Sequence, residues 1–235
     1  MKKLTGIIDR YNSDKHLPVA QRKSFTDFLE GSKLNSKSKV LSISTGDGIW
    51  DYIILSRYKN ITTLIATDIV DNPVKKADIK LLKSLGNWKF EKIKPETALP
   101  FRSNEFDLVY HFDVIEHVEK PYMFLQEQYR ILKHGGSIIL NTPNILRPTN
   151  ILKMFIGKLY FPYNIGKFEK IGDYIHIQEF TEWTLIQMLK EVGFQNIKVT
   201  PVFFGIFPLN IKISLLPKTG IGRILCHCFT IIAEK

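Results

Sequence analysis

The segment from Leu99 to Leu140 constrains the fold of this chain more than any other part of the sequence. It holds an apolar run (FDLVYHF), an amphipathic segment, a glycine pair and a second apolar run (SIIL). Polar side chains cluster around the end of the first run: His111, Asp113, Glu116 and His117. Such a unit buries both runs as strands of a parallel sheet and places the polar cluster at a carboxyl edge. In open α/β sheets, ligands bind at this edge.

The same alternation extends along most of the chain. Runs that read as strands cover 40–44, 61–69, 88–94, 106–112, 137–140, 196–204 and 226–234. Segments with helical spacing of apolar residues cover 19–29, 73–86, 121–136 and 181–194. This alternation predicts an α/β fold with a mostly parallel sheet and helices on both faces. No clear helix separates the last two runs, which predicts an antiparallel strand at one edge of the sheet.

The chain is long enough, at 235 residues, for one α/β domain with its own core. Residues 1–37 are expected to form an N-terminal helical cap on a domain that spans 38–235. The segment 143–178 breaks the alternation, because it mixes aromatic and basic residues with Pro and Gly. A structureless loop of that length is rare in a compact domain. The segment is therefore predicted to carry a short helix around 150–159 and to act as a lid or substrate-binding insert.

The charge of the chain is strongly positive, with 33 Lys and Arg against 23 Asp and Glu and a formal net charge of +10. Such an excess favours anionic partners, or it is an ordinary solvated surface. Cys226 and Cys228 are expected to be buried free thiols in a reducing compartment. No signal peptide is evident, and the apolar stretch 202–216 is too short and too interrupted to span a bilayer. We therefore expect a cytoplasmic protein, with contact to a membrane surface left open.

A glycine-containing turn, STGDG at residues 44–48, follows the first predicted strand. Gly46 and Gly48 allow the backbone to approach a ligand closely, and the following helix start offers unpaired N–H groups. Twenty positions after Gly48 the second strand ends at Asp68, an arrangement that suits the hydroxyls of a ribose. Asp51 stands where a pyrophosphate site has its third glycine, and its charge disfavours a dinucleotide. The turn therefore favours a nucleoside without a phosphate.

On these residues, the chain resembles the class I S-adenosylmethionine-dependent methyltransferases, most closely the small-molecule branch with quinone-biosynthesis and glycan O-methyltransferases. The resemblance covers residues 38–142 and, more loosely, 176–234. Five motifs carry it: VLSISTGDG, ATDI, LPFRSNEFDLVYHFDVIEHV, ILKHGGSIILNTPN and HIQEFTEWTLIQMLKEVGF. It implies a Rossmann-like class I methyltransferase fold, with a seven-stranded, mostly parallel sheet and an insert after the fifth strand. It also implies S-adenosyl-L-methionine as the cofactor.

By this resemblance, the cofactor lies along the carboxyl ends of the first, second and fourth strands. The residues implied in binding it are Ser42, Ser44, Thr45, Gly46, Gly48, Asp68, Ile69, Glu96, Thr97, His111 and Phe112. Asp68 would hold the ribose hydroxyls, and Ile69 would lie against the adenine. The family usually has an acid at the position of Ser42 and a glycine at the position of Ser44.

Three titratable side chains are the candidates for acid–base catalysis: Asp113, His117 and His176. An O-methyltransferase benefits from a base that takes the hydroxyl proton, and histidine titrates near neutral pH. Packing or helix capping is the alternative role for His117, and Glu116 is expected to be a structural hydrogen-bonding group. The sequence shows no clear set of metal ligands, so no metal is expected.

We therefore expect an enzyme that methylates an oxygen of a small molecule, such as a sugar or a lipid-linked intermediate. Two alternatives stay open: a non-catalytic binding protein of the same fold, motivated by Ser42 and Ser44, and an RNA methyltransferase, motivated by the positive charge. A nucleic-acid partner is not expected, because the fourth strand ends in HFDV and lacks a base-binding sequence of the Asn-Pro-Pro-Tyr kind. The sequence does not indicate the oligomeric state.

Overall fold

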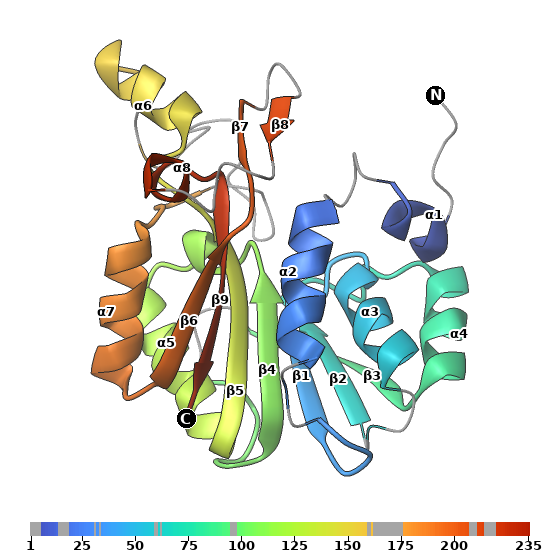
Figure 1. Ribbon diagram of the computed structural model, residues 1–235. Helices are drawn as coiled ribbons and strands as arrows, with labels where there is room; N and C mark the ends of the chain where they lie inside the picture. The colour runs from blue at the N-terminus through green and yellow to red at the C-terminus, as the bar shows by residue number, and fades with distance from the viewer. Residues whose placement is uncertain are drawn as a thin grey trace.

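A seven-stranded sheet runs through the middle of the computed structural model, and helices pack on both of its faces (Figure 1). The structure describes residues 6–13, 19–30, 32, 34–58, 61, 63–94, 98–158, 161, 176–206, 211–213 and 220–235. Among the helices of these residues, none is both long enough and apolar enough to cross a membrane.

The sheet has the strand order β3-β2-β1-β4-β5-β9-β6. Its strands are β1 (Lys39–Ile43), β2 (Thr63–Asp68), β3 (Trp88–Lys92), β4 (Phe106–Phe112), β5 (Leu132–Pro143), β6 (Gln195–Pro201) and β9 (Cys228–Glu234). Strands β1 to β5 pair in parallel, and β9 pairs antiparallel with both β5 and β6. The seven-stranded, mostly parallel sheet expected from the sequence is confirmed.

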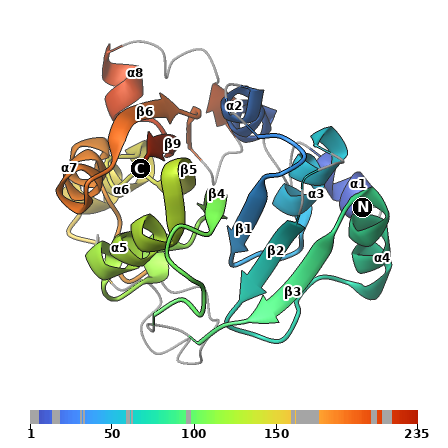
Figure 2. The same cartoon turned by 90° about the horizontal axis from the view of Figure 1, so that it is seen from below.

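Two groups of helices cover the two faces of the sheet. The first group is α1 (Ile7–Tyr11), α2 (Val19–Glu30), α3 (Ile49–Arg57) and α4 (Lys76–Leu85), and the second is α5 (Pro121–Ile131) and α7 (Glu182–Val192). Figure 2 shows the two groups on opposite sides of the sheet. The hydroxyl of Thr181 caps α7 by accepting the N–H of Thr184 at 3.1 Å, and Gly193 ends this helix with a φ of +115°.

Smaller elements lie beyond the carboxyl ends of the strands, at the top of Figure 1. They are the 3-10 helix η1 (Ile115–His117), α6 (Pro148–Phe155), α8 (Gly220–Ile224) and the hairpin of β7 (Phe204–Ile206) and β8 (Ile211–Ile213). The short helix expected within the insert is thus present as α6. Residues 159, 160 and 162–175 of that insert lie outside the described residues.

Alternation along the strands divides the core into two layers. In β1, Val40 joins the layer under α2 and α3, whereas Leu41 joins the layer under α5 and α7. All six residues of β2 are buried, as expected for a central parallel strand. Phe25 and Leu29 of α2 are fully buried in the first layer, so the N-terminal segment contributes to the same core.

The two closing strands form an antiparallel pair at one edge of the sheet, as expected: β6 is the edge strand and β9 lies next to it. β9 is mostly buried, whereas β6 is exposed or half-buried along its length. One expectation about a helix is wrong. The helix expected over 121–136 ends at Ile131, and β5 begins at Leu132. Gly135, with a φ of +75°, lies inside β5, close to where the pairing with β4 shifts register. The glycine pair therefore shapes the start of the strand and does not end the helix.

Candidate active site

The turn between β1 and α3 exposes backbone at the carboxyl edge of the sheet. Ser44 and Gly46 are exposed and adopt left-handed backbone conformations, with φ of +57° and +54°. The N–H of Thr45 donates to the carbonyl of Thr67 at 2.8 Å, which ties the turn to β2. A Cβ atom at Gly46 would meet no described atom within 4 Å. The turn therefore adjoins open space that a ligand can enter.

Asp68, at the end of β2, stands beside this turn. Its Oδ2 accepts the N–H of Gly46 at 3.3 Å, while its Oδ1 accepts the N–H of Ile69 at 2.8 Å and that of Val70 at 3.4 Å. Asp68 is buried, and Ile69 is half-buried against the core layer under α5 and α7. The structure thus brings the predicted ribose-binding acid and the glycine turn together.

A buried carboxylate stands behind the turn. Asp51 of α3 accepts hydrogen bonds from Thr45 Oγ1 at 2.8 Å, from Trp88 Nε1 at 2.7 Å and from the hydroxyl of Tyr110. Burial raises the pKa of Asp51, and the side chain of Ser42 is a further hydrogen-bonding partner. Asp51 is fully buried behind the turn. Ser42, where the resembled family has an acid, instead contacts a carboxylate from α3.

The last two side chains of β4 point to opposite faces of the sheet. His111 is buried toward α5, with its ring centroid 5.2 Å from that of Phe124. Burial lowers the His111 pKa to about 3, and neither ring nitrogen has a hydrogen-bond partner among the described residues. Phe112 stacks on Trp50 of α3, with ring centroids 3.6 Å apart. Both side chains pack against helices, so this strand end presents mainly backbone and the residues that follow it.

Titratable side chains gather beyond the ends of β4 and β5 and form what we term the acid–histidine cluster: Asp113, Glu116, His117, His176 and Glu179. The rings of His117 and His176 lie 4.9 Å apart, although the chain separates them widely. The carbonyl of Glu116 accepts the N–H of Ile177 at 3.0 Å, which fixes the segment before α7 against η1. The fold therefore unites the three predicted catalytic residues.

Two acids of the cluster are shifted toward their neutral forms. Asp113 is exposed as a residue, yet partial withdrawal of its carboxylate from water raises its pKa to about 6. The charge of His176 acts in the opposite direction and lowers this pKa. Glu116 is fully buried, and its Oε2 accepts the hydroxyl of Thr142 at 2.9 Å. Burial and the charge of Asp113 raise the pKa of Glu116 well above its usual range. This shift favours the neutral form of Glu116, which acts as a buried hydrogen-bonding group.

Glu179 is the anionic member of the cluster. It accepts hydrogen bonds from both guanidinium nitrogens of Arg147, from Asn150 Nδ2 at 2.8 Å and from His176 Nδ1 at 2.8 Å. Burial would raise the pKa of Glu179, but the bonds from His176 and Arg147 outweigh this effect and lower it. Glu179 was not recognised as a site residue from the sequence. Its position three residues after His176 could have indicated the contact with that histidine, but Arg147 lies too far along the chain for the pairing to be predicted.

The cluster also has the geometry of a metal site. Ligand atoms of Glu116, His117 and His176 all lie within 4.8 Å of one another, close enough to hold one metal ion. The expectation that no metal binds depended on the spacing of metal-ligating residues along the sequence. The fold removes this argument, because it places His176 next to Glu116 and His117.

The described residues fit a nucleoside-type cofactor on the other side of β4. Open space lies beside Gly46, Ser44 next to it is exposed, and the carboxylate of Asp68 accepts the Gly46 N–H at 3.3 Å. Glu96 and Thr97, which were expected at the rim of the adenine, lie outside the described residues.

Comparison with protein families identifies one match over most of the chain. Residues 14–199 match the family described as a methyltransferase domain.

Relatives among curated proteins match this chain at modest identity and over only part of its length. The chain is 37% identical over 107 residues to an uncharacterized protein of Methanocaldococcus jannaschii, a match that covers 45% of this chain and 46% of that protein. It is 27% identical over 149 residues to a ubiquinone biosynthesis O-methyltransferase of Nitrosomonas europaea, which covers 60% of this chain and 62% of the relative. The chain therefore spans about half to two thirds of the length of these relatives.

Solved structures share the fold at low sequence identity. The CurJ carbon methyltransferase superposes with a TM-score of 0.64 at 18% identity, over 95% of this chain and 55% of that chain. A SAM-dependent methyltransferase from Aquifex aeolicus superposes with a TM-score of 0.58 at 17% identity, over 97% and 95% of the two chains. The Rossmann-like methyltransferase fold is thereby confirmed.

Proposed function

We propose that this chain, which belongs to the methyltransferase domain family, is an S-adenosylmethionine-dependent enzyme that methylates an oxygen of a small molecule such as a sugar or a lipid-linked intermediate. When bound, the cofactor supplies an activated methyl group. The chain's own residues have to hold this cofactor, align the acceptor oxygen and take the proton that the oxygen loses. Alignment of two bound reactants can lower a barrier by about 7–11 kcal/mol.

The cofactor half of the site is assigned to the turn after β1 and the end of β2. The Asp68 carboxylate binds the ribose hydroxyls, since Asp68 stands beside the Gly46 N–H at 3.3 Å. The methionine part lies over Gly46, where no described atom stands within 4 Å of an added Cβ. This open space also argues against the non-catalytic alternative, in which a side chain would fill the pocket.

One observation carries the assignment of an oxygen acceptor: the contact between His176 Nδ1 and Glu179 Oε1 at 2.8 Å. Because the carboxylate of Glu179 only accepts hydrogen bonds, we assign the N–H of the neutral imidazole to Nδ1, where it donates a hydrogen bond to Glu179. Nε2 is then left as a proton acceptor, which is the arrangement of a histidine that acts as a general base. The pair therefore takes the hydroxyl proton while the oxygen gains the methyl group, and Glu179 stabilises the imidazolium that forms.

Other residues of the cluster orient this pair. His117 lies with its ring centroid 4.9 Å from that of His176, and Arg147 and Asn150 fix the carboxylate of Glu179. Asp113 ionises at a pKa of about 6 and so adds a negative charge near His176 at neutral pH.

A metal-assisted form of the same transfer is the second candidate, and the 4.8 Å grouping of Glu116, His117 and His176 favours it. A divalent ion at these ligands would lower the pKa of an acceptor hydroxyl and would replace the histidine base. Chelation separates the two forms. Full activity in excess EDTA supports the histidine base, whereas loss with EDTA and recovery with Mg²⁺, Mn²⁺ or Zn²⁺ supports the metal.

The acceptor class is tested with a panel assay that measures S-adenosylhomocysteine release. Phenols, sugars and polyprenyl-linked phenols are each offered as the free hydroxyl and as the methyl ether. Turnover of the free hydroxyl compounds and none of the ethers supports O-methylation. Turnover of both forms shows transfer to carbon and contradicts the proposal, and salt-sensitive turnover of RNA supports the RNA alternative instead.

A further inference from the structure

Exposed apolar side chains concentrate at one place on the molecule. Of the eleven large hydrophobic residues that the structure describes as exposed, seven belong to α6 and its following residue, the first turn of α7, and α8. These seven are Leu152, Met154, Phe155, Ile156, Trp183, Ile221 and Ile224, and each is more than half exposed. An apolar concentration of this kind on a soluble domain marks an interaction surface.

Contacts hold these three elements together at the carboxyl end of the sheet. Arg223 of α8 forms an ion pair with Glu182 of α7. Asn144 Nδ2 donates to the carbonyl of Ile224 at 2.7 Å, and the Asn144 carbonyl accepts a hydrogen bond from Arg147, the residue before α6. We call this part of the molecule the α6/α8 surface, defined by residues 152–158, Trp183, Ile221 and Ile224.

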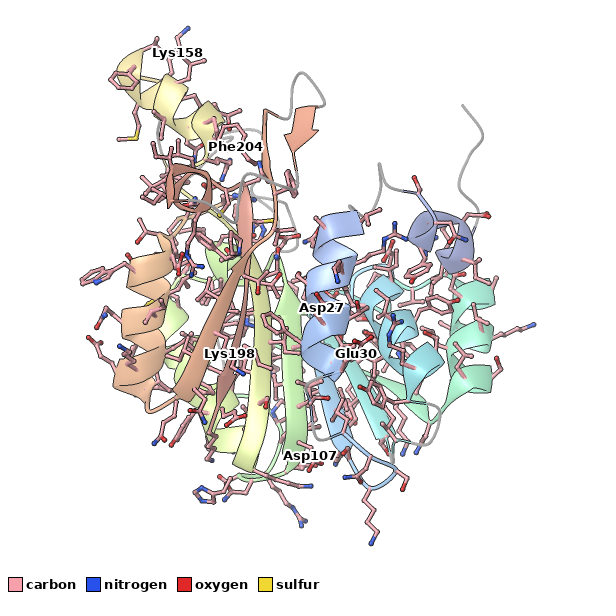
Figure 3. All side chains as sticks on the ribbon, in the orientation of Figure 1. Asp27, Glu30, Asp107, Lys158, Lys198 and Phe204 are labelled. Carbon is pink, nitrogen blue, oxygen red and sulfur yellow. The ribbon has the colours of Figure 1, made fainter. Side chains whose placement is uncertain are left out.

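The end of α6 is exposed on every side. All residues from 152 to 158 (LKMFIGK) are exposed, and Phe155 is exposed to 85%. Figure 3 shows α6 extending away from the sheet, with Lys158 at its far end. A helix gains most of its stability from packing of its apolar face, and the described residues offer no such packing to this end of α6.

The α6 side of this surface is positively charged. Residues 148–158 contain Lys153 and Lys158 and no Asp or Glu, whereas Arg223 of α8 is ion-paired with Glu182 of α7. The whole chain carries a net charge of +10. Apolar and aromatic side chains interleaved with lysines are typical of helices that lie in a lipid interface and draw on anionic headgroups.

A hollow adds apolar area to the α6/α8 surface. The cavity has a volume of about 290 Å³ and is lined by the apolar residues Leu146, Trp183, Ile186, Ile224 and Phe229, and also by Asn144, Thr181 and the Glu182–Arg223 ion pair. Its apolar part suits a segment of a lipid tail.

We propose that the α6/α8 surface docks the protein on an anionic lipid membrane. Phe155, Met154 and Ile156 enter the boundary between headgroups and acyl chains, and Lys153 and Lys158 contact the phosphates. Arg147 joins this surface to the active site, because it precedes α6 and also holds Glu179. If the proposed function holds, docking therefore presents the acid–histidine cluster to acceptors in the membrane.

Vesicle co-sedimentation tests the docking surface without cofactor or acceptor, so its outcome is independent of the proposed function. The full chain is mixed with phosphatidylcholine vesicles and with vesicles that also contain phosphatidylglycerol. We expect binding to the anionic vesicles that is at least tenfold stronger than to the neutral ones. The variant with Met154→Ser and Phe155→Ser should bind at least tenfold more weakly, and the variant with Lys153→Gln and Lys158→Gln should lose the anionic preference.

The matched control is Met123→Ser, which removes an apolar side chain of α5 that is 57% exposed and lies outside the surface. It should bind like the wild type, and thermal unfolding verifies that all variants are folded. Equal binding by the wild type and the Met154/Phe155 variant would overturn the proposal. A second result would also overturn it: a wild type that does not bind anionic vesicles but forms a dimer, while the Met154/Phe155 variant stays monomeric in sedimentation analysis. The surface would then bind a second copy of the chain.

Discussion

The two halves of the candidate active site lie at the same edge of the sheet, yet they are built in different ways. The cofactor half, around Gly46 and Asp68, consists of backbone groups and one carboxylate from neighbouring strand ends. The acceptor half joins titratable and charged side chains from β4–η1, from the start of α6 and from the segment before α7, including Glu116, Arg147 and Glu179.

This difference predicts different responses to mutation. Backbone geometry fixes the cofactor half, so a side-chain change there alters ligand affinity more than folding. Buried charges that balance one another fix the acceptor half, so a single change there leaves a charge without its partner. The free energy of unfolding and the pKa values of the neighbouring groups then change together.

The largest effect is expected for Glu179→Gln in the acceptor half. This change leaves the buried guanidinium of Arg147 without its anionic partner, which costs about 3 kcal/mol or more of unfolding free energy. Urea denaturation measures the loss. The control is Glu182→Gln, whose partner Arg223 has a side chain 45% exposed, and it should cost less than about 1 kcal/mol. Equal losses in the two variants would contradict a stabilising role for the buried cluster.

The next largest effect is expected for Asp68→Asn in the cofactor half. Loss of a charged hydrogen-bond acceptor costs about 1.5–3 kcal/mol of binding, so the affinity for S-adenosylhomocysteine should fall at least tenfold. Calorimetric titration measures this change. The matched control is Asp71→Asn, because the Asp71 side chain is 96% exposed and lies three residues away. If the control loses as much affinity as Asp68→Asn, the ribose-binding role of Asp68 is wrong.

A smaller effect concerns the pH dependence of the acceptor half. The pKa of Asp113 is about 6 in the folded state against 3.8 for the free side chain, so the folded state keeps this proton in the window between them. Stability therefore falls as the pH rises from about 4 to 6, and no further loss from this group follows above that range. Because Asp113 keeps contact with solvent, we expect less than about 1 kcal/mol. The difference in melting temperature between wild type and Asp113→Asn should grow through this window. A constant difference would contradict the shifted pKa.

The smallest effect is expected for Ser44→Gly in the cofactor half. Ser44 has a φ of +57°, a left-handed conformation that destabilises the folded state by about 1–2 kcal/mol when the residue carries a Cβ atom. Glycine removes this strain, but its greater freedom in the unfolded chain costs about 0.5–1 kcal/mol. The variant should thus be about 0.5 kcal/mol more stable. Ser44→Ala keeps the Cβ atom and should show no gain by the same denaturation measurement. A gain of equal size in the alanine variant would exclude backbone strain as the cause.

The same contrast explains what the sequence could predict. The glycine turn and Asp68 were recognisable because each follows an apolar strand closely, so local order places them. The mostly parallel sheet with an antiparallel pair at one edge was accessible for the same reason, whereas which of β6 and β9 forms the edge depends on their relative burial.

The acceptor half was harder to predict because long-range contacts create it. His117 and His176 were recognised singly, but their 4.9 Å approach depends on the fold. Glu179 was missed because its main partner, Arg147, lies 32 positions away. The hydrogen bond that Asp51 accepts from Trp88 was likewise not predictable, because it joins residues on α3 and β3 that only the fold brings together.

The independence of the two halves is tested by titrating S-adenosylhomocysteine into the wild type and into His176→Asn in a calorimeter. We predict that both proteins bind it with equal affinity, while the substitution abolishes release of S-adenosylhomocysteine in the acceptor assay. Absence of wild-type binding at millimolar ligand would contradict the assigned cofactor site. A tenfold loss of affinity in His176→Asn would show that the cluster holds the cofactor and does not act on the acceptor.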